Sequence, residues 1–203
     1  MKILILGGFL GSGKTSVVLQ LAKYIVGDSP ESASKVVIIE NEIGEVSIDD
    51  KMLRSGGYEV ANMFSGCVCC TMSGELVLGL YNIMHDFEPE LIIMEATGVA
   101  YPHSIRETIT QSMSDIECEV TCVTDAKRWK RLLRPMEMLL KDQLTAANVI
   151  LINKIDMVDD DLLVEVEASI RTFNDKARFF KISAAEQIDS KVFEAMLGND
   201  EVR

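Results

Sequence analysis

Three cysteines, Cys67, Cys69 and Cys70, lie within four positions in the stretch Gly-Cys-Val-Cys-Cys-Thr. Cysteines this close do not readily reach unstrained disulfide geometry, but their thiolates can converge on one metal ion. Packing in a core is the alternative, because free cysteine is among the most buried residue types. A Ser-Gly turn before the cluster and a polar helix start after it favour an accessible loop, and therefore a metal site.

A second chemical motif lies near the amino terminus, where residues 8–15 read Gly-Phe-Leu-Gly-Ser-Gly-Lys-Thr. This GxxxxGKT pattern follows an apolar strand pattern and opens a helix pattern, which distinguishes a phosphate-binding loop from a glycine-rich turn without a ligand. Backbone amides can wrap a phosphate, while Lys14 reaches the terminal phosphates and Thr15 offers a hydroxyl to Mg²⁺. The predicted phosphate-site residues are Gly8, Gly11, Ser12, Gly13, Lys14, Thr15 and Ser16.

Two further segments indicate that the base is guanine. Residues 153–156 read Asn-Lys-Ile-Asp after an apolar strand pattern and resemble the NKxD motif of GTPases. The Asp156 carboxylate can accept hydrogen bonds from the ring N–H and the amine of guanine, and adenine cannot supply that pair of donors. The Ser-Ala pair after the last expected strand resembles the second guanine loop. The predicted base-site residues are Asn153, Lys154, Asp156, Ser183 and Ala184.

Residues 95–98 read Glu-Ala-Thr-Gly directly after an apolar strand pattern. Glu95 can hold Mg²⁺ directly or through water, and the Gly98 amide can turn toward the γ-phosphate, as in a Walker B and second switch region. Taken alone, the segment is equally consistent with a glutamate that ends a strand beside a turn.

Short apolar runs alternate with segments of helical period, which predicts an α/β fold with a mostly parallel sheet and helices on both faces. The expected strands are Lys2–Gly7, Lys35–Glu40, Leu91–Glu95, Glu119–Thr124, Val149–Asn153 and Arg178–Ile182, with a further one around Tyr58–Met63. The expected helices are Lys14–Val26, Ser73–Phe87, Pro102–Ser112, Lys127–Ala147 and Asp160–Phe173. Cys118 and Cys122 share one face of a strand and are interpreted as packing residues.

The chain has 203 residues and a net charge of −12, with no composition break, so one domain over residues 1–203 is expected. The acidic surface argues against nucleic acid and anionic membranes as partners. The amino-terminal apolar run is too short for an export signal, and the five cysteines are an odd number. Together these features predict a cytoplasmic protein.

Five segments occur in an order that resembles the CobW-type metallochaperone GTPases: GGFLGSGKT, ENEIGEVSID, GCVCC, EATG and NKID. That group is related to the UreG and HypB nickel-insertion GTPases and, more distantly, to the MeaB-like chaperones of corrinoid enzymes. The resemblance covers nearly the whole chain and implies a P-loop NTPase three-layer sandwich. Members of the group usually continue into a smaller carboxyl-terminal domain, and the prediction here is a single GTPase domain without it.

The resemblance also implies roles for particular residues. Cys67, Cys69 and Cys70 match the CxCC metal motif, and Asp49 falls where the first switch approaches Mg²⁺ or the attacking water. The first-switch acids that can join the metal site are Glu40, Glu42 and Glu45. The catalytic residues implied are Lys14, Thr15, Asp49, Glu95 and Gly98, with Thr15 and Glu95 serving Mg²⁺.

The implied function is Mg²⁺-dependent hydrolysis of GTP to GDP and phosphate, with slow basal turnover, coupled to binding and delivery of a transition metal. Zn²⁺ is favoured for three sulfurs and an acid or water, with Co²⁺ and Ni²⁺ left open. Expected partners are a client metalloenzyme or cofactor-pathway protein, and a nucleotide- or metal-dependent homodimer. The alternatives are a GTP-dependent activator of a corrinoid or other metalloenzyme that delivers no metal, and a small-metabolite kinase.

Overall fold

Seven parallel strands form the centre of the molecule, in the order β3-β2-β4-β1-β5-β6-β7. This computed structural model describes residues 1–27, 36–40, 59–62 and 73–199. The strands are β1 (Lys2–Gly7), β2 (Val36–Glu40), β3 (Glu59–Asn62), β4 (Leu91–Glu95), β5 (Glu117–Asp125), β6 (Val149–Asn153) and β7 (Arg178–Lys181). Because all are parallel, their carboxyl ends meet at one edge of the sheet, where ligands of open α/β folds bind.

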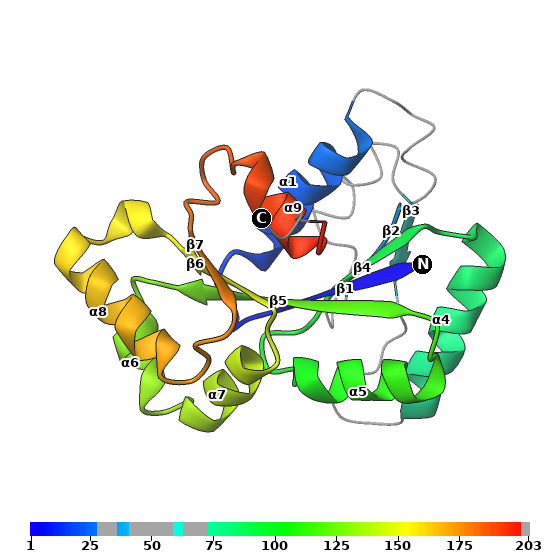
Figure 1. Ribbon diagram of the computed structural model, residues 1–203, viewed down its shortest axis with the longest axis horizontal. Coiled ribbons are helices and arrows are strands. Elements are labelled where there is room, and N and C mark those ends of the chain that lie inside the picture. The colour runs from blue at the N-terminus through cyan, green and yellow to red at the C-terminus, as the bar shows by residue number, and fades with distance from the viewer. Residues whose placement is uncertain (28–35, 41–58, 63–72, 200–203) are drawn as a thin grey trace.

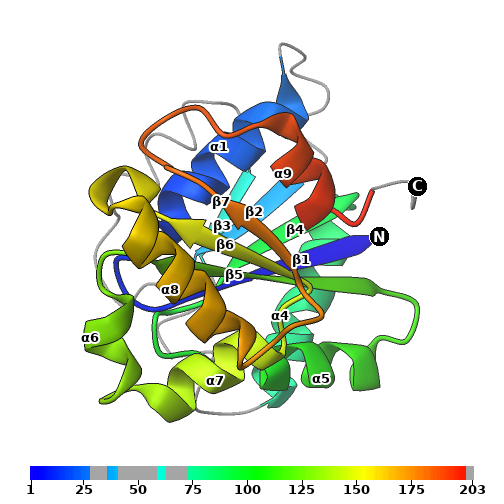
Figure 2. The same cartoon turned by 60° about the vertical axis from the view of Figure 1, so that its left-hand side comes forward.

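Helices cover both faces of the sheet, with α1 and α9 on one face and the rest on the other (Figures 1 and 2). Their bounds are α1 (Lys14–Val26), α4 (Ser73–Phe87), α5 (Pro102–Ser112), α6 (Trp129–Leu133), α7 (Glu137–Thr145), α8 (Asp160–Arg171) and α9 (Ser190–Met196), with a 3-10 turn at Ile155–Met157. No helix in the described ranges is both long and apolar enough to cross a membrane. The three-layer P-loop NTPase architecture expected from the sequence is confirmed.

The apolar core is divided by the sheet into two layers. Ile3 and Ile5 of β1 pack in the layer under α4, α5, α7 and α8, and Leu4 and Leu6 pack in the layer under α1 and α9. All four side chains are fully buried. A strand buried on both faces has no polar side to alternate with, which is why β1, β4 and β6 appear in the sequence as continuous apolar runs.

The predicted helix over Lys127–Ala147 is wrong. The structure has α6 and α7 there, separated by a turn at residues 134–136. Pro135 explains the break, because proline has no amide to donate and its ring clashes with the preceding turn of a helix. The chain also forms α9 after β7, a helix that the sequence analysis did not anticipate.

The acidic run predicted to begin α8 does so. Asp159 is the N-cap, and its Oδ1 accepts a hydrogen bond from the Leu162 amide at 2.8 Å. Substituting Asp159 with alanine leaves that amide without its cap, so the free energy of unfolding is expected to fall by about 1 kcal/mol in urea denaturation. Asp161→Ala, which changes a first-turn acid inside the helix, is the control and should cost less. Equal losses in the two variants would show that helix electrostatics, and not the cap, stabilises this end.

Cys118 and Cys122 both pack on one side of β5, as predicted. Cys122 is fully within the core layer, and Cys118 packs against the same layer while half-buried. Burial raises the pKa of Cys118 to about 11 and that of Cys122 to about 12. Both therefore remain neutral thiols at physiological pH, which makes them poor metal ligands.

Candidate nucleotide and metal site

The phosphate loop connects β1 to α1 at the centre of the sheet edge. Gly13 has φ 103° and caps α1, and a Cβ there would lie 2.2 Å from Asn153 Nδ2, so only glycine fits. The buried Lys14 ammonium donates to the Gly8 carbonyl at 3.0 Å and so crosses the loop. Ser12 is buried with no hydrogen-bond partner for its hydroxyl among the described residues, and Ser16 is exposed in the first turn of α1. The glycine backbone and the start of α1 suit a phosphate.

The two residues predicted to hold Mg²⁺ lie in contact. Thr15 is in the first turn of α1, and its hydroxyl donates to Glu95 Oε1 at 3.0 Å. Glu95 ends β4, the neighbour of β1, and is almost fully buried. A hydroxyl and a carboxylate beside a phosphate loop are the oxygen donors that Mg²⁺ prefers. The residues present therefore fit the ion.

Asn153 connects the phosphate loop to both predicted base segments. Its Nδ2 donates to the Ser12 carbonyl at 2.8 Å, and its Oδ1 accepts from the Lys154 and Ala184 amides, each at 2.8 Å. The side chain is buried, so these hydrogen bonds face no competition from water. The arrangement joins residues that are more than a hundred positions apart in sequence into one site.

Asp125, which ends β5, anchors a charged network under the phosphate loop. Its Oδ2 accepts from Lys154 Nζ at 2.7 Å and from Arg128 Nε at 2.6 Å. Those cations also donate to the loop, Lys154 to the Gly11 carbonyl and Arg128 to the Leu10 carbonyl, each at 2.7 Å. Burial alone would raise the pKa of the Asp125 carboxyl, but hydrogen bonds from Lys154 and Arg128 outweigh it and lower the pKa.

The lowered pKa of Asp125 predicts a pH-dependent contribution to stability. A carboxyl whose pKa is lower in the folded state stabilises the protein above its usual pKa, and that contribution is lost as the pH falls through the lowered value. Asp125→Asn is therefore expected to cost about 2 kcal/mol at pH 7 and progressively less below about pH 4, measured by urea denaturation. Glu165→Gln, which removes an exposed ion pair with Lys130, is the control. An Asp125→Asn cost independent of pH would contradict the electrostatic account.

The segment after β4 is held between the phosphate loop and α7. Gly98 packs so closely that a Cβ would lie 2.5 Å from the Leu10 amide nitrogen. The carbonyls of Gly98 and Ala100 accept hydrogen bonds from the buried Gln143 Nε2, at 3.2 and 3.1 Å. Gly98 is thus fixed directly against the phosphate loop.

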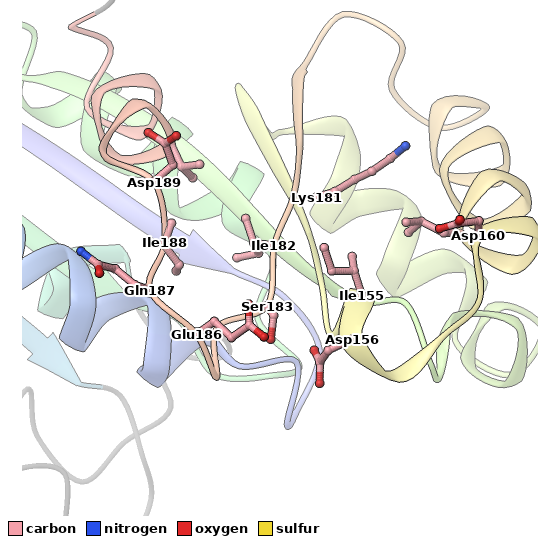
Figure 3. Close-up of a pocket in the computed structure, with 12 residues that line it drawn as sticks. Ile155, Asp156, Asp160, Lys181, Ile182, Ser183, Glu186, Gln187, Ile188 and Asp189 are labelled. Atoms are coloured by element: carbon pink, nitrogen blue, oxygen red, sulfur yellow. The ribbon is translucent and has the colours of Figure 1, made fainter.

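A pocket of about 470 Å³ lies beside β7 and reaches the predicted base site. Figure 3 shows Asp156, Ser183 and Glu186 at one end of it. The Asp156 carboxylate is exposed, so a base can reach it. The Ala184 amide already donates to Asn153, which fixes the backbone of this segment next to Asp156.

Most of the predicted transition-metal ligands lie outside the described residues. These are Cys67, Cys69, Cys70, Glu42 and Glu45, and Asp49 of the first switch also lies outside. Glu40 is the last residue of β2, and its backbone pairs in register with that of Glu95. Within residues 1–27, 36–40, 59–62 and 73–199, no three histidine, cysteine or acidic side chains form a group that could hold a metal.

Comparison with known families decides the relationship. A model of the CobW/HypB/UreG nucleotide-binding domain matches residues 2–181. The chain belongs to this family. The CobW-type resemblance predicted from the five motifs is therefore confirmed.

Relatives of this CobW/HypB/UreG domain include named zinc proteins. A zinc-regulated GTPase metalloprotein activator 1 of Dictyostelium discoideum is 28% identical over an alignment 221 residues long, gaps included. The alignment covers 89% of this chain and 45% of the relative. A zinc chaperone CobW of Sinorhizobium sp is 30% identical over an alignment of 203 residues, which covers 83% of this chain and 55% of the relative. The chain thus spans about half the length of the curated relatives it matches.

Solved structures show the same fold at low identity. HypB from Helicobacter pylori in complex with nickel aligns with a TM-score of 0.67 at 17% identity, covering 97% of this chain and 83% of that one. The Zn(II)-bound YjiA GTPase of E. coli aligns with a TM-score of 0.61 at 21% identity, covering 98% of this chain and 62% of the YjiA chain. These CobW/HypB/UreG structures confirm the P-loop architecture of the domain.

Four residues that support the site were not identified from the sequence: Gln20, Asp125, Arg128 and Gln143. Asp125 carries a signal that could have been used, because it ends a buried strand at the same sheet edge as Glu95. Gln20, Arg128 and Gln143 each donate to a main-chain carbonyl far along the chain, of Ala184, Leu10 and Gly98 respectively, and local sequence gives no sign of these contacts.

Proposed function

We propose that the protein is a GTP-hydrolysing metallochaperone in which the nucleotide state controls binding and delivery of a transition metal through Cys67, Cys69 and Cys70. The observation that carries this proposal is the register of Glu40 with Glu95 at the sheet edge. Glu95 contacts Thr15 of the phosphate site, and Glu40 is the first of the acids expected in the metal site. This register supports the proposal, because it sets the backbone of a predicted metal-site residue beside that of a predicted Mg²⁺ residue.

The strand order supports the same proposal from the cysteine side. β3 ends at Asn62, in register with Glu40, and α4 begins at Ser73. The cysteine motif lies in the connection between these two elements. In a parallel sheet, a strand's carboxyl end and the start of the following helix lie at the same edge. The strands that precede the metal and nucleotide segments consequently end at the same edge of the sheet, with β2 between β3 and β4.

The described residues account for the nucleotide half of the proposal. Lys14 and the amides of the phosphate loop would hold the β- and γ-phosphates, and Thr15 with Glu95 would hold Mg²⁺. Mg²⁺, when bound, neutralises charge on the phosphate oxygens. Asp156 would read the guanine edge, while Asn153 keeps the base segments attached to the phosphate loop. Gly98, which packs on Leu10 of the phosphate loop, would move when the terminal phosphate is lost.

We infer that loading with GTP brings residues 41–57 toward the thiolates, so that Glu42 and Glu45 join the ligand set, and that hydrolysis reverses this. Asp49 would act on the attacking water or on Mg²⁺. Hydrolysis by the isolated chain is expected to be slow and to accelerate with a client or in a dimer. A cytoplasmic location is proposed on the cysteine content, since a reducing compartment keeps the thiols available.

The zinc-chaperone relatives favour Zn²⁺ as the metal that is delivered, with Co²⁺ and Ni²⁺ as alternatives. The test is anaerobic measurement of Zn²⁺ bound per chain in the wild type and in a Cys67→Ser, Cys70→Ser double variant. Loss of tight Zn²⁺ binding is expected in the double variant alone. Cys118→Ser is the matched control, because that half-buried thiol has a raised pKa and packs against the apolar layer.

Two outcomes would overturn the metal half of the proposal. One is a double variant that binds Zn²⁺ as tightly as the wild type. The other is a double variant that loses Zn²⁺ but still activates a client metalloenzyme fully. The second result would favour a GTP-dependent activator that delivers no metal.

A further inference from the structure

A single glutamine side chain holds the segment that follows the last strand. Gln20, on α1, donates from Nε2 to the carbonyls of Ala184 and Glu186 at 3.0 and 2.9 Å. Its Oε1 accepts a hydrogen bond from the Ile188 amide at 3.0 Å. Three main-chain groups spread over five residues are thus fixed by one half-buried side chain. Side-chain hydrogen bonds at this density restrict a loop that regular secondary structure does not support.

Gln20 lies on the far side of this segment from the base pocket. It lines an open groove of about 620 Å³ between α1 and α9, together with Lys23, Tyr24 and Phe193. The pocket that contains Asp156 has a different lining, of which Gln20 is not a member. Residues 186–188 line both hollows, so the segment is the wall between them. Gln20 therefore contacts the segment on the side away from the pocket, and it would not touch a base bound there.

Among the described residues, a second side chain, that of Asn153, also holds this segment. The Asn153 side chain accepts a hydrogen bond from the Ala184 amide, while the Gln20 side chain donates one to the Ala184 carbonyl. The peptide groups on both sides of Ala184 are held by these two side chains. Gln20 also sits on the helix that begins with Lys14 and Thr15, so the phosphate site and the base segment share a rigid connection.

We propose that Gln20 is the positioning residue for base selectivity, and this inference rests on GTP being the nucleotide. The 6-position of guanine is an oxygen, which needs an N–H donor from the segment, whereas adenine presents an amine there. A segment held at three points offers donors in a fixed direction. A looser segment can rotate a carbonyl toward the base and accept the adenine amine, so selectivity falls while phosphate binding remains.

The test is equilibrium binding of GDP, ADP and pyrophosphate, each with Mg²⁺, to the wild type, Gln20→Ala and Gln20→Glu. In Gln20→Ala the preference for GDP over ADP should fall about tenfold, with pyrophosphate affinity within about twofold of wild type. Gln20→Glu places a carboxylate against two carbonyl oxygens, so its preference should fall at least as far. Lys23 lines the same groove and, within the part of the chain that the structure describes, its side chain makes no hydrogen bond to the segment, so Lys23→Ala should keep the wild-type preference.

The outcomes separate this inference from the proposed function. A wild type that does not prefer GDP over ADP contradicts GTP as the nucleotide. A wild type that prefers GDP, together with a Gln20→Ala variant that keeps this preference, overturns the role of Gln20. Equal losses of GDP, ADP and pyrophosphate affinity in Gln20→Ala would show general structural damage and would also overturn it.

Discussion

Asp156→Asn is expected to reduce GDP affinity by about 10²-fold or more and to create affinity for xanthosine diphosphate. The Asp156 carboxylate is exposed beside the base segment and offers only acceptors. An asparagine amide directs a donor at the guanine amine, which also donates, whereas the 2-oxygen of xanthine can accept. The measurement is equilibrium binding of the two nucleoside diphosphates with Mg²⁺.

Asp160→Asn is the control for this exchange. Asp160 lines the same pocket but lies in the first turn of α8, beyond the Asn-Lys-Ile-Asp segment. That variant should keep the wild-type order of affinities. If Asp156→Asn also keeps its preference for GDP, the base is bound elsewhere and the base-site prediction is wrong.

Lys14→Ala is expected to lower kcat/KM for GTP hydrolysis by about 10³-fold or more. The ammonium is buried within the phosphate loop and donates to the Gly8 carbonyl, so it is already placed where the terminal phosphates would lie. Alanine removes the positive charge and one of the contacts that fix the loop. Phosphate release under single-turnover conditions would measure the loss directly.

Lys23→Ala tests whether this loss is specific to the phosphate site. Lys23 is on the same helix but exposed to solvent. Its removal changes the charge of α1 by the same amount and should leave kcat/KM nearly unchanged. A Lys14→Ala variant with near wild-type hydrolysis would mean that another cation serves the phosphates.

The parts of the fold that the sequence predicted well are those with a local physical cause. The bounds of β1, β4 and β6 were predicted because continuous apolar runs between turn residues mark strands buried on both faces. The phosphate loop was predicted because its glycines, Lys14 and Thr15 lie within eight positions. The start of α8 was predicted because an aspartate side chain can cap a helix without help from distant residues.

The features that the sequence did not predict depend on tertiary contacts, or on a local signal that competes with the periodic pattern of apolar residues. Pro135 broke a helix whose apolar period continued across it, so the periodic pattern alone was misleading. Gln20 looks like an ordinary polar position of a surface helix, and only the fold brings residues 184–188 against it. The same is true of Gln143, which is unremarkable in sequence but binds the carbonyls after β4.

Asn153 links the phosphate loop to the second of the segments proposed to bind the base. It binds the phosphate loop and the second base segment at once, and the phosphate loop leads into Thr15, which contacts Glu95. Glu95 lies in register with Glu40, the residue at which the chain leaves β2 toward the first switch. Under the proposed function, a change at the γ-phosphate would reach Glu40 through Thr15 and Glu95.

The most direct test of the account is the Zn²⁺ affinity of the protein in two nucleotide states. An anaerobic competition titration would compare the GDP-bound protein with protein bound to a non-hydrolysable GTP analogue, both with Mg²⁺. The account predicts one tight site that requires Cys67 and Cys70 and whose affinity differs between the two states by about tenfold or more. Equal Zn²⁺ affinity in both states would contradict coupling between the nucleotide and the metal.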